Sequence, residues 1–167
     1  MWSRNPNSVT FDTNVLPARR QPDDLIKLAG SKGLDLARVV VTDRELEGTD
    51  IRVDIVGLNP IPASTAWAEA YWDKSVWASD ESILGEILKI ISNGSFPQSR
   101  DNLNDGEKRQ LRDALILDAH VQQGRYILVT KDTRGFVRHG RREKFEGLYE
   151  IKIMTKEEFR EFLRGLD

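Results

Sequence analysis

The sequence predicts an α/β protein with a mostly parallel sheet that helices cover on both faces. Short β-branched runs alternate along the chain with longer segments whose apolar residues recur at helical spacing. The β-type runs are rich in β-branched residues, which is typical of strands buried on both faces. In such sheets ligands gather at the carboxyl ends of the strands, so this edge is where we expect a functional site.

The first half of the chain supplies two predicted strands and a helix between them. Residues 9–11 form a short β-type run that ends on Asp12. A helix is expected over 22–30, because a proline begins the segment and a glycine ends it. Residues 37–42 are a second β-branched run of the buried type, and Glu45 follows it closely.

The middle of the chain is harder to interpret, and the second half returns to regular alternation. Residues 51–55 alternate like a strand that Pro60 and Pro62 would end. The other elements expected are a helix at 79–94, a long helix at 104–124, a strand at 126–130, a charged loop, a strand at 149–154 and a final helix from Thr155.

Composition limits the chemistry that this chain can carry. At 167 residues we expect a single domain over 1–167 that buries a core of its own. Cysteine is absent, which excludes zinc–thiolate sites, thiol nucleophiles and disulfides. The two histidines, His120 and His139, are not spaced as a metal pair. Metal chemistry would therefore use oxygen ligands, which suit Mg²⁺ or Mn²⁺.

Charge and hydropathy set expectations about location and partners. The formal net charge is −2, so binding of nucleic acid would require a local basic surface. We find neither the apolar run of a signal peptide nor a stretch long enough to span a bilayer. We therefore expect a cytoplasmic protein without a membrane partner.

Several carboxylates stand where a parallel sheet would collect them. Asp12, Glu45 and Asp132 lie at or just past predicted strand ends. Asp113 lies in the long predicted helix among apolar neighbours, where an unpaired carboxylate would be costly. Clustered carboxylates need a shared proton or a divalent cation, and a hard cation can promote phosphodiester hydrolysis. The pattern therefore indicates a metal-dependent nuclease.

Each of these acids also has an ordinary structural explanation. Asp12 could cap a turn, and Asp132 could form an Asx-turn. Near Glu45, the neighbouring acids Asp43 and Glu47 could supply the same carboxylate or form a solvated charged run. Asp118 follows Asp113 by five positions, roughly 140° around a helix, and we interpret it as structural.

Taken together, the motifs resemble those of the PIN-domain nucleases, which include toxins of bacterial and archaeal toxin–antitoxin pairs. The likeness covers residues 8–46 and 104–165, whereas 47–103 match nothing that we can align. The similar stretches are Val9–Asn14, Val40–Thr42 with Glu45 and Leu46, Asp113–Ile116, Gly124, Leu128–Asp132 with Phe136, and Ile151–Phe159.

The resemblance implies a three-layer α/β/α sandwich and cleavage of RNA without a covalent protein intermediate. It implies that Asn14 and Thr130 orient the metal ligands through hydrogen bonds. An antitoxin protein or a second copy of the chain is a partner compatible with it. The implied catalytic and metal-binding residues, for one or two Mg²⁺ or Mn²⁺ ions, are Asp12, Glu45, Asp113 and Asp132.

A basic segment follows the last of these acids and is the predicted RNA surface. Gly135 and Gly140 would make it flexible enough to close over a substrate. A solvated loop or a surface for an acidic protein partner would have the same composition. The residues expected to contact RNA phosphates are Arg134, Arg138, Arg141, Arg142 and Lys144.

Two other functions compete with the nuclease. A phosphatase of the haloacid-dehalogenase type also has an aspartate after its first strand, but it needs a second one where Asn14 stands. A non-catalytic module that binds RNA or protein could share the fold. Retention of four mutually repelling acids argues against it, and binding of divalent ions would distinguish the two.

Overall fold

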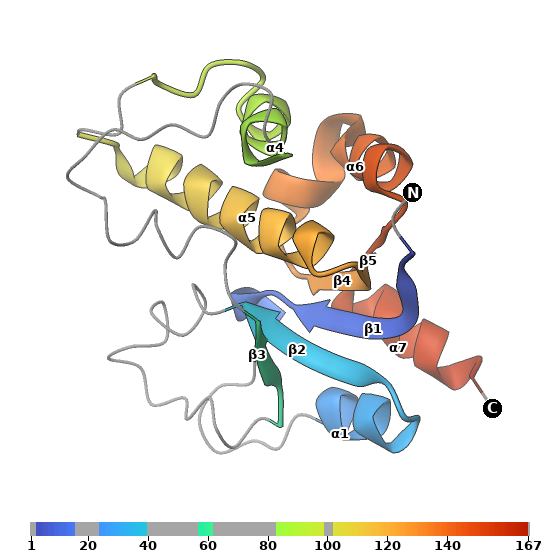
Figure 1. Ribbon diagram of the computed structural model, residues 1–167. Coiled ribbons are helices and arrows are strands. Elements are labelled where there is room, and N and C mark those ends of the chain that lie inside the picture. Colours follow the sequence, from blue (N-terminus) through green and yellow to red (C-terminus); the bar gives the residue numbers. More distant parts are fainter. Residues whose placement is uncertain (1–2, 16–23, 40–56, 62–82, 99–101, 167) are drawn as a thin grey trace.

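The computed structural model of the chain describes residues 3–15, 24–39, 57–61, 83–98 and 102–166. These residues form a five-stranded, all-parallel sheet with helices packed on both of its faces (Figure 1). The predicted α/β class is therefore confirmed.

The strands are β1 (Asn5–Phe11), β2 (Asp35–Val39), β3 (Asn59–Ile61), β4 (Arg125–Thr130) and β5 (Lys152–Thr155). The helices are α1 (Asp24–Ser31), α4 (Ile83–Ile91), α5 (Asp105–Gln122), α6 (Arg141–Tyr149) and α7 (Lys156–Arg164). Short helical turns occupy η1 (Thr13–Val15), η3 (Thr133–Val137) and η4 (Arg138–Gly140).

The sheet order is β3-β2-β1-β4-β5, with β1 at the centre. From β1 the chain moves outward to β2 and β3, then crosses back to place β4 on the other side of β1. The order of the strands thus reverses between β1 and β4. Crevices for ligands form at such a reversal, outside the carboxyl ends of the two strands.

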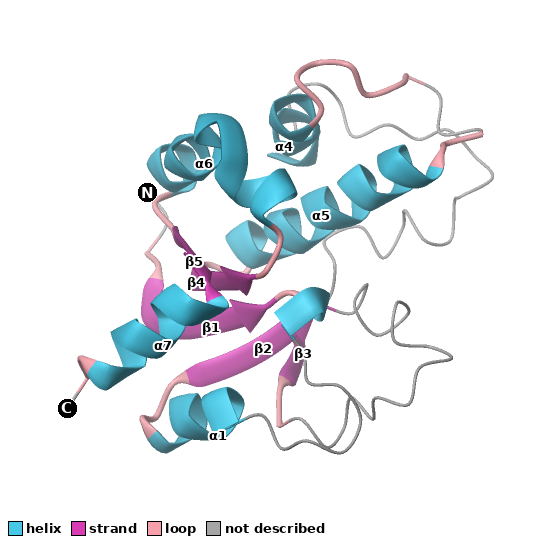
Figure 2. Cartoon of the chain, turned by 180° about the vertical axis from the view of Figure 1, so that it is seen from behind, coloured by secondary structure: helices cyan, strands magenta, loops and turns pink. Residues whose placement is uncertain are grey.

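Helices α4, α5 and α6 cover one face of the sheet, and α1 and α7 cover the other (Figures 1 and 2). Successive strand residues point to opposite faces, so each strand supplies both cores. Phe11 on β1 packs edge-on against Phe159 of α7, with ring centroids 5.7 Å apart. Leu128 on β4 belongs to the core under α5. Helices thus cover both faces of the sheet, as the buried type of these strands predicted.

The side of β1 that faces α5 is polar and buried. Thr10 and Asp12 alternate there with the apolar residues of the opposite face. The Thr10 hydroxyl lies 2.9 Å from Nδ1 of His120 on α5 and accepts a hydrogen bond from Nε of Arg125 at 3.1 Å. Burial of His120, followed by the positive charges of Arg125 and Arg4, lowers the pKa of its imidazole to about 3. A neutral histidine therefore belongs to the folded core.

Two predictions about the second half of the chain are wrong. The charged loop expected after Asp132 is largely helical, since it forms η3, η4 and α6. Tyr149, expected to begin a strand, ends α6, and β5 begins at Lys152. Phe145 and Tyr149 are one helical turn apart and are both buried. This apolar stripe is short and is surrounded by charged residues, so the sequence pattern did not reveal it. Its two side chains nevertheless hold α6 against the core.

The predictions for the middle of the chain are only partly testable. Pro60, expected to end a strand, lies inside β3, the edge strand of the described sheet. An edge position tolerates proline because its missing N–H is not needed there. The strand predicted at 51–55 and the end of the run at 37–42 lie outside the described residues.

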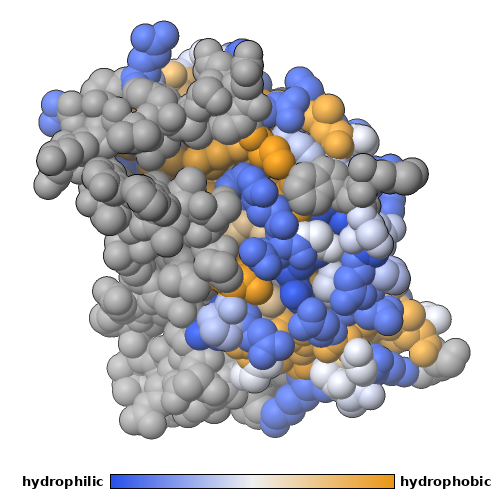
Figure 3. Space-filling view, in the orientation of Figure 1, coloured by the Kyte–Doolittle hydropathy of each residue, from blue (hydrophilic) through white to orange (hydrophobic). Residues whose placement is uncertain are grey.

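In the described part of the chain, no helix is long and apolar enough to cross a membrane. On the face in Figure 3, a hydrophilic band crosses the described surface, and hydrophobic side chains emerge on either side of it. The exposed large hydrophobic residues of the described ranges, Leu28, Leu148 and Leu166, come from different parts of the fold.

Candidate active site

Asp12 and Thr130 lie where the strand order reverses, at the carboxyl ends of β1 and β4. Asp12 follows β1 directly and is 3% exposed, and Thr130 ends β4 and is fully buried. The Thr130 hydroxyl donates to Oδ2 of Asp12 at 2.7 Å and accepts from the backbone N–H of Asp132 at 2.8 Å. One hydroxyl thus joins the acid after β1 to the turn that carries the acid after β4.

Asn14 strengthens this connection from the η1 turn. Its side-chain carbonyl accepts from the backbone N–H of Lys131 at 2.8 Å, and its Nδ2 lies 3.5 Å from Oγ1 of Thr130. Thr130 thus bonds directly to Asp12, and Asn14 bonds to Thr130 and to the backbone of Lys131, whereas the role expected of both beside a metal ion stays a prediction. These hydrogen bonds hold the turns after β1 and β4 against each other.

The carboxylate of Asp132 has two distinct environments. Its Oδ1 accepts from the backbone N–H groups of Arg134 and Gly135, at 2.8 and 3.0 Å. This oxygen caps η3, so the structural explanation of Asp132 as a turn residue is correct. The other oxygen, Oδ2, faces the backbone of Gly135. Capping uses one oxygen and leaves the carboxylate in a fixed orientation.

Asp113 on α5 approaches the same side of this glycine, the side on which a Cβ would stand. A Cβ atom on Gly135 would lie 2.7 Å from Oδ2 of Asp132 and 2.9 Å from Oδ2 of Asp113. Both distances are shorter than any ordinary carbon–oxygen contact, so only glycine fits there without displacing a carboxylate. The expectation that Gly135 gives a loop its flexibility is wrong, because Gly135 is buried in a helical turn.

Glu45 and its neighbours Asp43 and Glu47 lie outside the described residues, so their relation to the site stays a prediction. Within the described ranges, no group of three or more acidic or histidine side chains is arranged to hold a metal ion. That part of the chain instead provides two carboxylates around Gly135, with Asp12 connected to them through Thr130.

Asp118 is separate from these acids, as expected from its position on the helix. It is buried, and Nε2 of Gln122 lies 3.5 Å from its Oδ1. Burial raises the pKa of the Asp118 carboxyl to about 6, against the opposing effect of the Gln122 hydrogen bond. The structural interpretation of Asp118 stays a prediction.

The basic segment is divided between two sides of α6. Nη1 of Arg141 donates to the carbonyl of Arg134, which ties the start of α6 to η3. Arg142 instead pairs with Glu158 of α7, at 2.8 Å. Arg138 and Lys144 are exposed. The segment is regular and internally bonded, so the flexible loop that the glycines suggested is not observed.

In comparisons with known proteins, no family model, curated protein or solved structure matches this chain. The parallel α/β fold is thus established by the structure, and the likeness to PIN-domain nucleases stays a prediction from the motifs.

Proposed function

We propose that the acidic group at the carboxyl ends of β1 and β4 is the site of a metal-dependent ribonuclease of the PIN type. The observation that carries the proposal is the pair of carboxylate oxygens, from Asp132 and Asp113, that lie 2.7 and 2.9 Å from the point where a Cβ on Gly135 would stand. Two like charges in one place raise the energy of the folded protein unless a cation or a proton joins them. A bound cation would offset this repulsion, and Asp12 is connected to the pair through the Thr130 hydroxyl.

The residues fit a small, hard cation by their chemistry. The donors are all oxygens, and the absent side chain of Gly135 leaves room beside both carboxylates. Asp113 and Asp132 would hold Mg²⁺ or Mn²⁺, with Asp12 connected to them through Thr130, and Glu45 is the proposed fourth acid. A cation bound there would neutralise charge on a phosphodiester and supply an activated water.

The remaining groups of the site position these acids. The Thr130 hydroxyl is buried and both donates and accepts hydrogen bonds, so it is poorly suited to act as a nucleophile. Cysteine is absent from the chain. Attack by water, without a covalent protein intermediate, is the reaction class that agrees with both facts.

RNA is the proposed substrate because a basic segment begins two residues after Asp132. Arg134 and Arg138 are exposed there, on η3 and η4. Positive charges beside an acidic metal site attract the phosphate backbone and position it across the site.

The decisive experiment measures cleavage of a mixed single-stranded RNA with Mg²⁺ or Mn²⁺ and with EDTA. Asp132→Asn and Asp113→Asn should lose cleavage, because each removes a negative charge from the proposed cation site. Asp105→Asn is the matched control, since Asp105 lies on α5 like Asp113 but is 98% exposed at the helix start. Equal cleavage in EDTA would contradict the proposal.

Binding of the cation is tested separately from cleavage. Mn²⁺ should raise the melting temperature of the wild type and of Asp105→Asn, because a ligand that binds only the folded state stabilises it. The shift should be much smaller for Asp113→Asn and Asp132→Asn. If Mn²⁺ and RNA bind the wild type without cleavage, the non-catalytic module is the correct function.

A further inference from the structure

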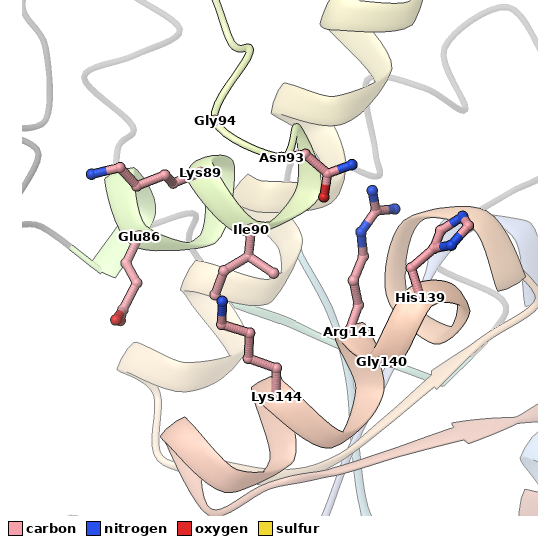
Figure 4. Close-up of a pocket in the computed structure, with 9 residues that line it drawn as sticks. All are labelled: Glu86, Lys89, Ile90, Asn93, Gly94, His139, Gly140, Arg141 and Lys144. Carbon is pink, nitrogen blue, oxygen red and sulfur yellow. The ribbon is translucent and has the colours of Figure 1, made fainter.

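A pocket of about 460 Å³ lies between α4 and the start of α6 (Figure 4). Its volume is in the range of pockets that hold small organic ligands. The residues that line it are Glu86, Lys89, Ile90, Asn93, Gly94, His139, Gly140, Arg141 and Lys144.

The charges of this pocket are unusual for an acidic chain. Lys89, Arg141 and Lys144 contribute three positive charges, whereas the protein as a whole carries −2. The one lining carboxylate, Glu86, accepts a hydrogen bond from the Tyr149 hydroxyl at 2.6 Å. The Glu86 carboxylate therefore already has a hydrogen-bond partner. The described lining residues carry more positive than negative groups, and this excess favours an anion.

Polar groups in the pocket face one another across α4 and α6. Figure 4 shows the Arg141 guanidinium directed toward the Asn93 amide, with the His139 imidazole beside it. Nε of Arg141 is shielded from solvent and has no hydrogen-bond partner within the described residues. A buried N–H without a partner costs free energy, which a small movement that brings this N–H to a bound acceptor would remove.

The backbone around the pocket is also unusual. Asn93 and His139 both adopt left-handed conformations, with φ of 52° and 62°. Residues other than glycine rarely do so, and such strain collects at binding sites. His139 is followed by Gly140, the N-cap of α6. As a glycine, this N-cap has no side chain that could accept a hydrogen bond from the first turn of α6.

We propose that this pocket binds one nucleotide of the RNA strand that the acidic site cleaves. Arg141 and Lys144 contact its phosphate, the His139 ring stacks on its base, and the Asn93 amide bonds to the base edge. Arg141 also holds the Arg134 carbonyl, next to Gly135. Four residues separate His139 from Gly135, so their Cα atoms are at most about 15 Å apart. A single strand of a few nucleotides spans both places.

This inference rests on the proposed function for the identity of the strand, so its test avoids cleavage. Binding of a fluorescent single-stranded RNA is measured by anisotropy in EDTA at several salt concentrations. Adenosine 5′-monophosphate, adenosine, inorganic phosphate and polyglutamate serve as competitors. The nucleotide should compete best, because it alone supplies both the phosphate and the base.

The variant Arg141→Gln/Lys144→Gln should bind RNA several-fold more weakly. The slope of log affinity against log salt should fall by about 0.7 for each phosphate that the variant no longer neutralises. Arg160→Gln/Lys27→Gln is the matched control, with the same change of charge on α7 and α1, across the sheet. Asn93→Gly removes the amide without disturbing a left-handed backbone and should weaken competition by the nucleotide.

Equal RNA affinity of the two double variants would overturn the pocket assignment. Competition by polyglutamate but not by the nucleotide would also overturn it, in favour of an acidic protein partner. If the nucleotide binds as expected but the wild type does not cleave RNA with Mn²⁺, the proposed function fails and the pocket remains.

Discussion

Replacement of Gly135 by alanine is the most direct test of the carboxylate pair. The new methyl carbon would lie 2.7 Å from Asp132 and 2.9 Å from Asp113, so at least one carboxylate must move. Asp132 moves at a cost, because its Oδ1 is held by two backbone N–H groups. Overpacking of this kind destabilises a protein by about 1–3 kcal/mol.

The effect is steric, because φ of Gly135 lies outside the left-handed region that excludes alanine. Gly147 on α6 provides the control, since a Cβ there would meet no atom within 4 Å. Alanine in a helix is favoured over glycine by roughly 0.5–1 kcal/mol. The same chemical change should therefore destabilise the protein at Gly135 and stabilise it at Gly147.

Urea unfolding followed by circular dichroism measures both changes, and titration with Mn²⁺ measures the function. Displacement of groups that orient metal ligands costs about 10–100-fold in metal affinity, and we expect Gly135→Ala to fall in this range. The Gly147→Ala protein should bind Mn²⁺ like the wild type. If Gly135→Ala matches the wild type in both stability and Mn²⁺ affinity, the carboxylates are not held around this glycine.

The buried polar groups support three further predictions. Thr130→Val should lose about 1–3 kcal/mol of stability in urea unfolding, because it removes the donor to buried Asp12, whereas Thr130→Ser should retain most of it. Because the pKa of His120 falls from 6.5 in the unfolded chain to about 3 in the fold, stability should decline as pH falls through this window. Urea unfolding between pH 7 and 4 should show that His120→Gln lacks this component, and an unchanged slope would contradict the assignment. For Asp118, the pKa is raised from 3.8 to about 6, so its contribution is present below pH 3.8 and lost above 6. Asp118→Asn should accordingly exceed the wild type in stability at pH 8, by on the order of 1 kcal/mol after solvent screening, and lose this advantage near pH 4.

Local patterns predicted most of the described fold. An apolar run identified the strand around Leu128, as is typical of a strand buried on both faces, and a short β-type run identified the strand around Val9. Asn104 and Thr155 each form a capping box with a glutamate three residues later, and both helix starts were predicted within a residue. The predictions failed at α6, where the buried Phe145 and Tyr149 are too few to stand out from the surrounding charges.

From the sequence alone, Asp12 and Asp132 could be placed just after strands, since a strand end is a local property of the chain. The sequence could not determine which oxygen of Asp132 caps a turn, or that its other oxygen and one of Asp113 both lie beside Gly135. It also could not show that Asn93, in the turn after α4, lines the same pocket as Arg141 of α6. These relations join residues that are distant along the chain, and only the packing of α4, α5 and α6 on one face of the sheet fixes the distances between them.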